Sequence, residues 1–172
     1  QSKPPLPDLG QIKPGAMDCQ SDLAARYFSE GADLDEGDAE QQERAVVAYR
    51  QALALDPSLV PALVNLANLH YARDELIEAL ALYERAIHLE PDCFEAYFNL
   101  GNIQHDLGRF GDARDCYQLA VRLNPSHADT HFYLAVTLEK LGRSKDARPH
   151  WQVYQQLVPD GEWVALAKEF SE

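Results

Sequence analysis

Histidine and cysteine are the residue types in this 172-residue chain that most often perform catalysis or bind metals. Neither the HExxH spacing of a zinc site nor a nucleophile partner accompanies the histidines His70, His105, His127 and His131. No CxxC pair and no histidine at zinc-ligand spacing accompanies the cysteines Cys19, Cys93 and Cys116. We therefore predict no catalytic residue, no metal site and no cofactor, and the chain is not predicted to be an enzyme.

Asparagine supplies a different chemistry, because its side-chain amide both donates and accepts hydrogen bonds. Asn65 and Asn99 lie 34 residues apart in two similar phrases, VNLANLHYARDE at 64–75 and FNLGNIQHDLGR at 98–109. Amides repeated in this way can hold the backbone of an extended peptide without reading its side chains. The spacing also indicates an internal repeat.

Proline marks this repeat most plainly, because each of four prolines ends a phrase with a helical apolar pattern, where a helix should stop. They follow at intervals of 34 residues and are Pro57, Pro91, Pro125 and Pro159. Small and aromatic residues keep the same interval one helical turn apart, at Ala45, Ala79, Ala113 and Ala147 and then at Tyr49, Tyr83, Tyr117 and Trp151. The pattern predicts helix–turn–helix units whose small residues allow close helix packing.

The composition is that of a globular chain, with 46% hydrophobic residues. The sequence contains no apolar run near 18 residues and no signal peptide, so we predict no membrane span and a cytoplasmic location. The net charge of −13 disfavours direct binding of nucleic acid and favours a neutral or basic partner.

The prolines, alanines and aromatic residues that recur every 34 residues together resemble the tetratricopeptide repeat (TPR) family, over about residues 22 to 160. We call each set of equivalent residues a column. The resemblance implies an all-α fold, a right-handed TPR solenoid of four helix–turn–helix repeats with a C-terminal capping helix. We expect an extended proline-rich segment at 1–20, which is a linker, a vector-derived tag or a fused peptide. The four repeats are expected at 21–59, 60–93, 94–127 and 128–159, and the capping helix at 160–172 with its stripe at Trp163, Ala167 and Phe170.

The resemblance also implies a concave groove lined by the first helix of each repeat. The family's groove positions fall in this sequence on Val64, Asn65, Asn68, Tyr71, Glu95, Phe98, Asn99, Asn102, His105, Asp106, Asp129, Phe132, Tyr133 and Val136. The set mixes amides, aromatic rings and carboxylates, which suits a peptide backbone with apolar or basic side chains. The carboxylates favour a ligand that carries lysine or arginine.

Two interpretations of the asparagines remain open. They resemble the asparagine ladder in the TPR region of O-linked N-acetylglucosamine transferases, which would place them against a ligand; alternatively, they bridge neighbouring helices. The carboxylate clamp of chaperone-binding TPR domains needs basic residues, whereas this sequence has Val64, Glu95 and Asp129 or Tyr133 there. Phe98 and Phe132 are either core residues or the strongest contacts of the groove.

The resemblance implies a non-enzymatic protein-interaction module that binds a peptide or protein segment in its groove. The N-terminal segment, with two lysines in KPPLPDLGQIK, is a candidate ligand of its own or a neighbouring molecule. Two other functions stay open. The chain is alternatively a regulatory or assembly domain of a larger bacterial enzyme or regulator, since its end resembles the TPR arrays of some MerR-type regulators, or it is a self-associating scaffold.

Overall fold

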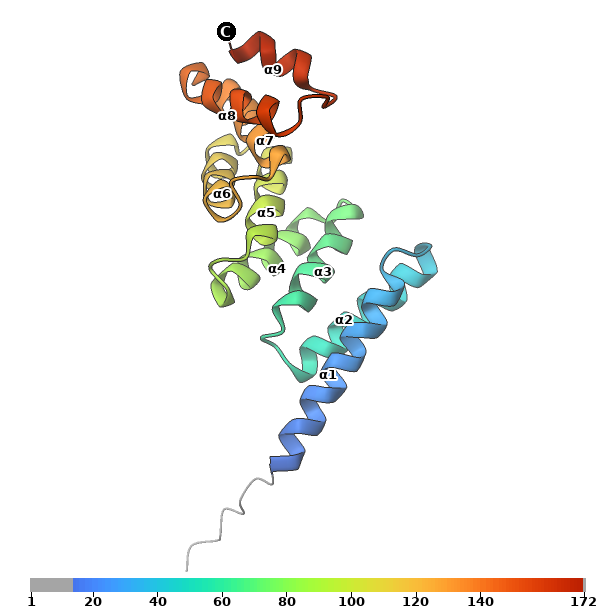
Figure 1. Cartoon of the computed structure of the whole chain (residues 1–172). Coiled ribbons are helices and arrows are strands. Elements are labelled where there is room, and N and C mark those ends of the chain that lie inside the picture. Colours follow the sequence, from blue (N-terminus) through green and yellow to red (C-terminus); the bar gives the residue numbers. More distant parts are fainter. Residues whose placement is uncertain (1–13, 172) are drawn as a thin grey trace, which may run out of the picture. The chain divides into compact units, whose positions relative to one another are not determined.

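The computed structural model describes residues 14–171, and every secondary-structure element in that range is an α-helix. The predicted all-α fold of consecutive helix pairs is therefore confirmed (Figure 1). The chain divides into two compact units, 1–59 and 60–172, which are described separately below. No helix within the described range is both long enough and apolar enough to span a bilayer.

The first unit is a pair of packed helices, α1 (Pro14–Leu34) and α2 (Ala39–Leu55). Helix α2 begins with a capping box, in which Asp38 accepts a 2.9 Å hydrogen bond from the Gln41 amide and Gln41 accepts one of 2.9 Å from the Asp38 amide. The phenol of Tyr49 is fully buried and donates a 2.5 Å hydrogen bond to Asp35. These contacts fix the turn that joins the two helices.

The start of α1 corrects the expectation of an extended segment over residues 1–20. The helix begins at Pro14, so residues 14–20 are helical, whereas residues 1–13 lie outside the described part of the chain. The physical reason is that proline is tolerated at the first helical position, where its missing N–H would have no partner. Pro14 is also the last proline before Pro57, so nothing after it interrupts the helix.

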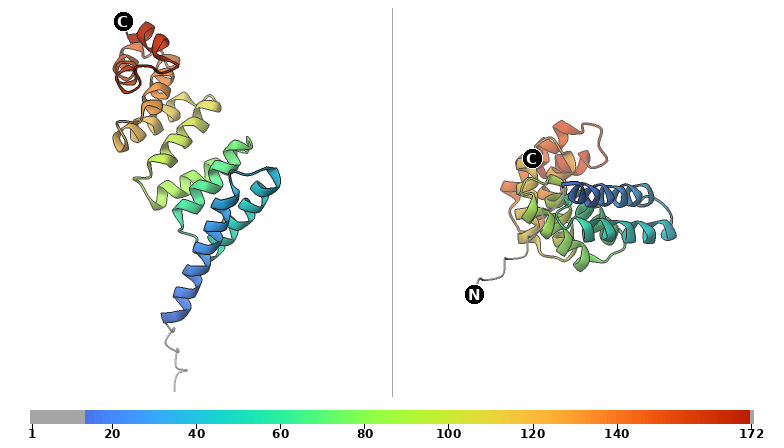
Figure 2. Two further views of the ribbon diagram at one scale, coloured as in Figure 1. Left: turned by 45° about the vertical axis from the view of Figure 1, so that its right-hand side comes forward. Right: turned by 90° about the horizontal axis from the view of Figure 1, so that it is seen from below.

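The second unit contains three further helix pairs and a terminal helix (Figures 1 and 2). The pairs are α3 (Val60–Ala72) with α4 (Leu76–Leu89), α5 (Phe94–Asp106) with α6 (Phe110–Leu123), and α7 (Ala128–Lys140) with α8 (Ser144–Leu157). Helix α5 packs on α4 and helix α7 packs on α6, so each pair contacts the next within this unit. The core is therefore continuous from pair to pair.

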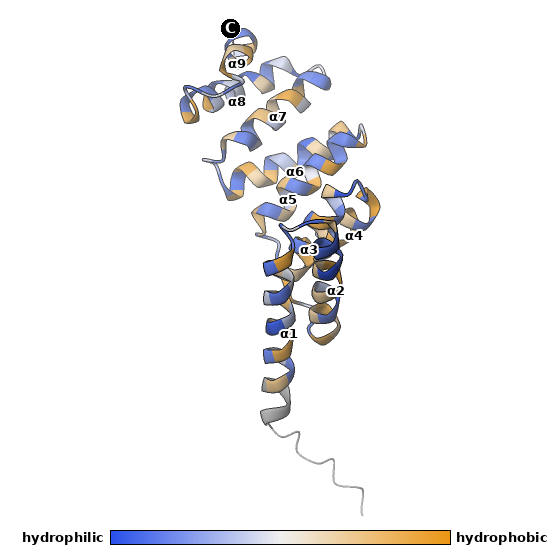
Figure 3. Cartoon of the chain, turned by 90° about the vertical axis from the view of Figure 1, so that its right-hand side faces the viewer, coloured by the Kyte–Doolittle hydropathy of each residue, from blue (hydrophilic) through white to orange (hydrophobic). Residues whose placement is uncertain are grey.

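The alanine and aromatic columns form the core of each pair. Tyr83, Tyr117 and Trp151 are at most 1% exposed, and the alanines one turn before them are fully buried. Helix α5 approaches α6 so closely at Gly101 that a Cβ there would lie 2.7 Å from the ring of Tyr117. Colouring by hydropathy shows hydrophobic and hydrophilic residues interleaved along the helices, as expected for amphipathic elements (Figure 3).

The terminal helix α9 (Val164–Ser171) packs against α8. Ala167 is fully buried, and the ring of Phe170 stacks on that of Trp151 with centroids 5.8 Å apart. Trp163 precedes the helix and lies 5.6 Å from the ring of Phe132, yet both Trp163 and Phe170 remain more than 40% exposed. Of the predicted stripe of Trp163, Ala167 and Phe170, only Ala167 is therefore fully buried.

Candidate functional site

The first helices α3, α5 and α7 of the second unit carry the predicted groove residues, and we call their shared surface the first-helix face. Side-chain contacts join these helices to one another. Tyr71 of α3 donates a 2.8 Å hydrogen bond to Asp106 of α5, and the rings of Phe98 in α5 and Tyr133 in α7 lie 6.0 Å apart. Three successive repeats therefore contribute to one surface.

Asn68 is the centre of a hydrogen-bond network on this face. Its Oδ1 accepts a 3.0 Å hydrogen bond from Nδ2 of Asn99, and its Nδ2 donates a 3.0 Å hydrogen bond to Glu95. Both partners lie on α5, so the amide of Asn68 connects α3 to the following repeat. Of the two equivalent asparagines Asn65 and Asn99, Asn99 therefore bridges neighbouring helices, and its partner is Asn68.

A second type of contact links Asn68 and Asn102 to the tyrosine of their own repeat. The hydroxyl of Tyr83 donates to Oδ1 of Asn68, and the hydroxyl of Tyr117 donates to Oδ1 of Asn102 at 2.6 Å. The two contacts are formed by residues at equivalent positions of successive repeats. Because both phenols are fully buried, these amides satisfy hydroxyl groups that would otherwise have no partner.

A small pocket on this face is lined by residues of α3, α5, α6 and α7. It is lined by Tyr71, Asn102, His105, Asp106, Tyr117 and Tyr133. The rings of Tyr117 and Tyr133 are stacked, with centroids 6.1 Å apart and planes 17° from parallel. The pocket thus combines three phenol rings with one carboxylate.

The electrostatics of the pocket follow from partial burial. Burial raises the pKa of the Tyr71 phenol, and its hydrogen bond to Asp106 raises that pKa further. Burial lowers the pKa of His105, and the attraction of Asp106 only partly opposes this shift. These shifts favour the protonated phenol of Tyr71 and the neutral imidazole of His105.

The predicted site residues differ in how much of each side chain reaches solvent. Glu95, Asp106, Asp129 and Tyr133 are exposed, with Tyr133 at 36%. The half-buried members are Asn65, Asn68, Tyr71, Phe98, Asn99, Asn102, His105, Phe132 and Val136. Of these, Phe98, Phe132 and Val136 pack against the hydrophobic core, so they provide only part of their surface to a ligand.

Val64 is the one predicted site residue that the structure removes from the groove. Its side chain is only 4% exposed, so it has almost no surface for a ligand. The reason is visible at the equivalent position of the next repeat, where Phe98 lies against Tyr117 of α6 and Tyr133 of α7. This column of the first helices turns toward the core and the following repeat, not toward solvent.

Tyr117 belongs to the pocket but was absent from the predicted set. Its place in the repeat, on a second helix, predicts only a member of the aromatic core column. Its ring is indeed fully buried, yet the hydroxyl reaches Asn102 on the first-helix face. The signal that identifies it is the pairing of an asparagine with a tyrosine 15 residues later, which occurs at 68 and 83 and again at 102 and 117.

Two histidines lie together elsewhere in the second unit. Nε2 of His131 lies 2.7 Å from the carbonyl oxygen of Pro125, and its Nδ1 lies 3.1 Å from Nδ1 of His150. Burial, with a smaller contribution from His131, lowers the pKa of His150 to about 4. Nowhere in the described part of the chain do three or more His, Cys, Asp or Glu side chains gather as a metal site would require.

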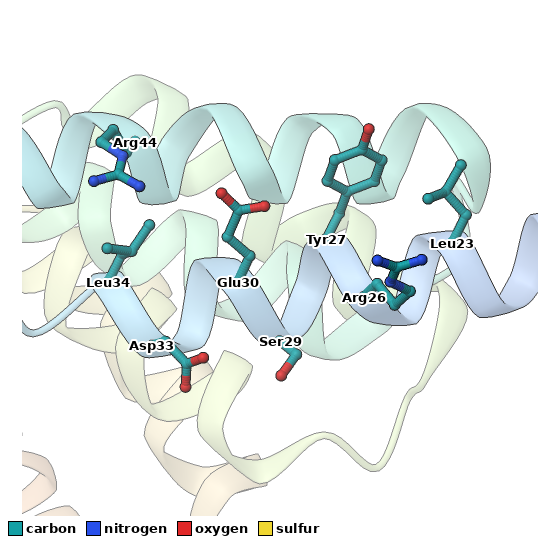
Figure 4. Close-up of a pocket in the computed structure, with 8 residues that line it drawn as sticks. All are labelled: Leu23, Arg26, Tyr27, Ser29, Glu30, Asp33, Leu34 and Arg44. Carbon is teal, nitrogen blue, oxygen red and sulfur yellow. The ribbon is translucent and has the colours of Figure 1, made fainter.

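The first unit has a pocket of its own, along α1 (Figure 4). It is lined by Leu23, Arg26, Tyr27, Ser29, Glu30, Asp33 and Leu34, with Arg44 from α2. Figure 4 shows Ser29 and Asp33 pointing away from Glu30 and Tyr27, so the polar groups do not converge on one point. This arrangement offers less for a specific ligand than the pocket on the first-helix face.

Comparison with known proteins agrees with the repeats that the sequence indicates. A family model described as "Tetratricopeptide repeat" matches residues 64–126 and, in a second register, residues 104–162, which together make up more than half of the chain. The chain belongs to the tetratricopeptide repeat family. A search of curated protein sequences gave no match.

Solved structures share this fold at low sequence identity. A crystal structure of MamA superimposes with a TM-score of 0.76 at 22% identity, covering 87% of this chain and 82% of MamA. The first TPR of Spaghetti (RPAP3), bound to the HSP90 peptide SRMEEVD, gives 0.66 at 18% identity, covering 71% of this chain and 95% of the other. The Arabidopsis OM64 TPR domain gives 0.66 at 17% identity, with 70% and 98% covered.

Proposed function

We propose that this TPR chain is a non-enzymatic protein-interaction module, and that its second unit binds an extended peptide segment along the first-helix face. The observation that carries the proposal is the pocket lined by residues of α3, α5, α6 and α7. It brings together side chains from three repeats, Tyr71, Asp106 and Tyr133 among them. An extended ligand that crosses the repeats would contact all three of them at this point.

The surface chemistry supports a peptide as the ligand. Tyrosine rings give a large contact area at a low cost in side-chain entropy, and Tyr133 is the most exposed aromatic ring in the pocket. The side-chain amide of Asn102 is half-buried at the same face; its Oδ1 accepts from Tyr117, and its Nδ2 can donate to a carbonyl of a peptide backbone. Asn68 and Asn99 contribute less, because they are engaged with each other.

The charge of the face supports a neutral or basic ligand. Glu95, Asp106 and Asp129 are all exposed on the first helices, and the chain has a net charge of −13. The peptide bound to the Spaghetti TPR, SRMEEVD, carries three acidic residues. An acidic peptide of that kind would be repelled by these carboxylates, so the ligand proposed here has the opposite charge preference.

The proposal is tested by selecting peptides from a random display library on the full chain and measuring the affinity of the best binder by fluorescence anisotropy. Tyr133→Ala should weaken binding at least about tenfold, as expected for an aromatic anchor near the centre of an interface. Leu119→Ala is the matched control, because Leu119 lies on the second helix α6 and is 38% exposed, close to the 36% of Tyr133. It should leave the affinity unchanged.

The opposite pattern would reject this surface. If Leu119→Ala weakened binding while Tyr133→Ala did not, the ligand would lie along the second helices. A selection that yields no peptide at all would reject peptide binding altogether. Circular dichroism of both variants confirms that each retains its helices.

A further inference from the structure

We infer that the pocket formed by Tyr71, Asp106, Tyr117 and Tyr133 is a subsite for one arginine side chain of the ligand. The inference rests on the proposed function, since it specifies a residue of the peptide that the first-helix face would hold. It goes beyond that proposal by assigning one pocket to one kind of side chain. The occupant is a guanidinium group, held by aromatic rings and by the carboxylate of Asp106.

The rings make the pocket attractive to a cation. Tyr71, Tyr117 and Tyr133 come from three different helices and line the same small pocket. A cation within about 6 Å of the face of a tyrosine ring is attracted by the ring quadrupole. Tyr133 is the ring best placed for this contact, because its side chain is exposed whereas that of Tyr117 is fully buried.

The carboxylate of Asp106 supplies the opposite charge. Its Oδ2 accepts the hydrogen bond of Tyr71, and its side chain remains 50% exposed, so the carboxylate retains accessible acceptor positions. Within residues 14–171, no lysine or arginine forms an ion pair with Asp106. Nδ1 of His105 lies 3.9 Å from Oδ1 of Asp106, but burial lowers the pKa of His105 and so favours the neutral imidazole, which carries no charge to pair with the carboxylate.

The geometry favours arginine over lysine. A guanidinium group is planar, so it can lie flat on the ring of Tyr133 while its N–H groups donate to the carboxylate of Asp106. Guanidinium is also more weakly hydrated than ammonium, which makes its transfer from water into an aromatic pocket less costly. A lysine would keep the charge attraction but lose the stacking and the paired hydrogen bonds.

The first test uses the isolated side chain as the probe. The full chain is titrated with N-acetyl-arginine N-methylamide and with the citrulline analogue, which has nearly the same shape but no charge, and the ring signals of Tyr71 and Tyr133 are followed by NMR. The arginine compound should shift both rings in a saturable way, and the citrulline compound should bind at least about fivefold more weakly. Equal binding of the two compounds would overturn the inference.

Paired variants locate the binding. Asp106→Asn should weaken binding of the arginine compound about tenfold, whereas Asp115→Asn makes the same charge change on α6, where Asp115 pairs with Arg114, and should have no effect. Tyr133→Phe keeps the ring and should retain binding, whereas Tyr133→Leu should lose it. Equal effects of the two aspartate variants would show that only the net charge of the chain attracts the arginine compound, and would contradict a specific subsite at Asp106.

Peptides selected from the display library separate this inference from the proposed function. If they bind the first-helix face and lose about tenfold in affinity when one arginine becomes citrulline, both hold. If they bind that face without needing a basic residue, the proposed function survives and the subsite is wrong. Deleting residues 1–13 in a parallel experiment shows whether the basic N-terminal segment competes for the pocket.

Discussion

The hydroxyl of Tyr117 in α6 donates a 2.6 Å hydrogen bond to the side-chain oxygen of Asn102 in α5. The phenol ring is fully buried, whereas the asparagine is only half-buried at the first-helix face. The contact therefore joins the core of this repeat to the surface that we propose binds a ligand. One residue of the pair depends on the bond more than the other, because only the tyrosine is shielded from water.

This asymmetry predicts unequal effects on stability. Asn102→Ala should lower the free energy of unfolding by about 1–2 kcal/mol, because it leaves a buried hydroxyl without an acceptor. Tyr117→Phe should cost less, since Asn102 can then form hydrogen bonds with water. Adding Asn102→Ala in the Tyr117→Phe background should have almost no further effect. Urea unfolding of the three variants measures this, and equal costs in both backgrounds would show that the bond contributes nothing.

The close approach of α5 to α6 predicts a steric effect at Gly101. Gly101→Ala should lower the free energy of unfolding by about 1–3 kcal/mol, because its Cβ would lie 2.7 Å from the rigid ring of Tyr117. Gly111→Ala in α6 is the control, since a Cβ there meets nothing within 4 Å, and it should raise stability by up to about 1 kcal/mol. Thermal unfolding shows whether each variant is less or more stable than the original chain, and destabilisation by both variants would contradict this account.

The turn after α3 offers a stabilising substitution. Asp74 has a φ of 59°, at the position that Gly108 and Gly142 occupy in the next two repeats with φ of 72° and 71°. Asp74→Gly should raise the free energy of unfolding by about 0.5–1 kcal/mol, because glycine adopts this left-handed conformation without steric cost. Gly142→Ala should do the reverse by about 1 kcal/mol. A loss of stability in Asp74→Gly, measured by urea unfolding, would mean that the aspartate side chain stabilises the turn.

The pair of His131 and His150 predicts a loss of stability in mild acid. Burial lowers the pKa of His150 to about 4 from its ordinary value of 6.5. Between these pH values the unfolded chain binds more protons than the folded one. The contribution of His150 to the free energy of unfolding is therefore fully present above about pH 6.5 and is lost as the pH drops toward about 4. Burial gives His105 a shift of the same sign.

Urea midpoints measured from pH 7 to pH 4 test the assignment to His150. His150→Gln should flatten part of the decline, because one group that gains a proton only on unfolding is removed. His88→Gln is the control on an exposed histidine and should leave the pH dependence unchanged. A decline that persists unaltered in His150→Gln would assign the effect to other groups.

The repeat architecture could be predicted because its determinants recur at a fixed interval. The alanine and aromatic columns bury their side chains in every pair, so one pattern specifies the same packing four times. The start of α1 could not be predicted in the same way, since a proline at the first turn indicates either a break or a helix start. Pro14 turned out to begin the helix.

The details of the site depended on contacts that spacing does not reveal. Val64 is the neighbour of Asn65 in α3, but successive residues point about 100° apart around a helix, and the side chain of Val64 is buried. The hydrogen bonds of Asn68 to Tyr83 and Asn99 could not be predicted, because they depend on the distances between α3, α4 and α5, which residue spacing does not give. That the remaining residues bind a ligand is still a prediction.

The most direct test of the central claim is to record which side chains respond when a library-selected peptide binds the full chain. Side-chain amide signals of Asn65 and Asn102 and ring signals of Tyr71 and Tyr133 should shift in NMR spectra on addition of the peptide. The methyl signals of Leu119 and Leu123, on the second helix α6, should stay in place. Shifts confined to those leucines, with the asparagine and tyrosine signals unmoved, would contradict binding at the first-helix face.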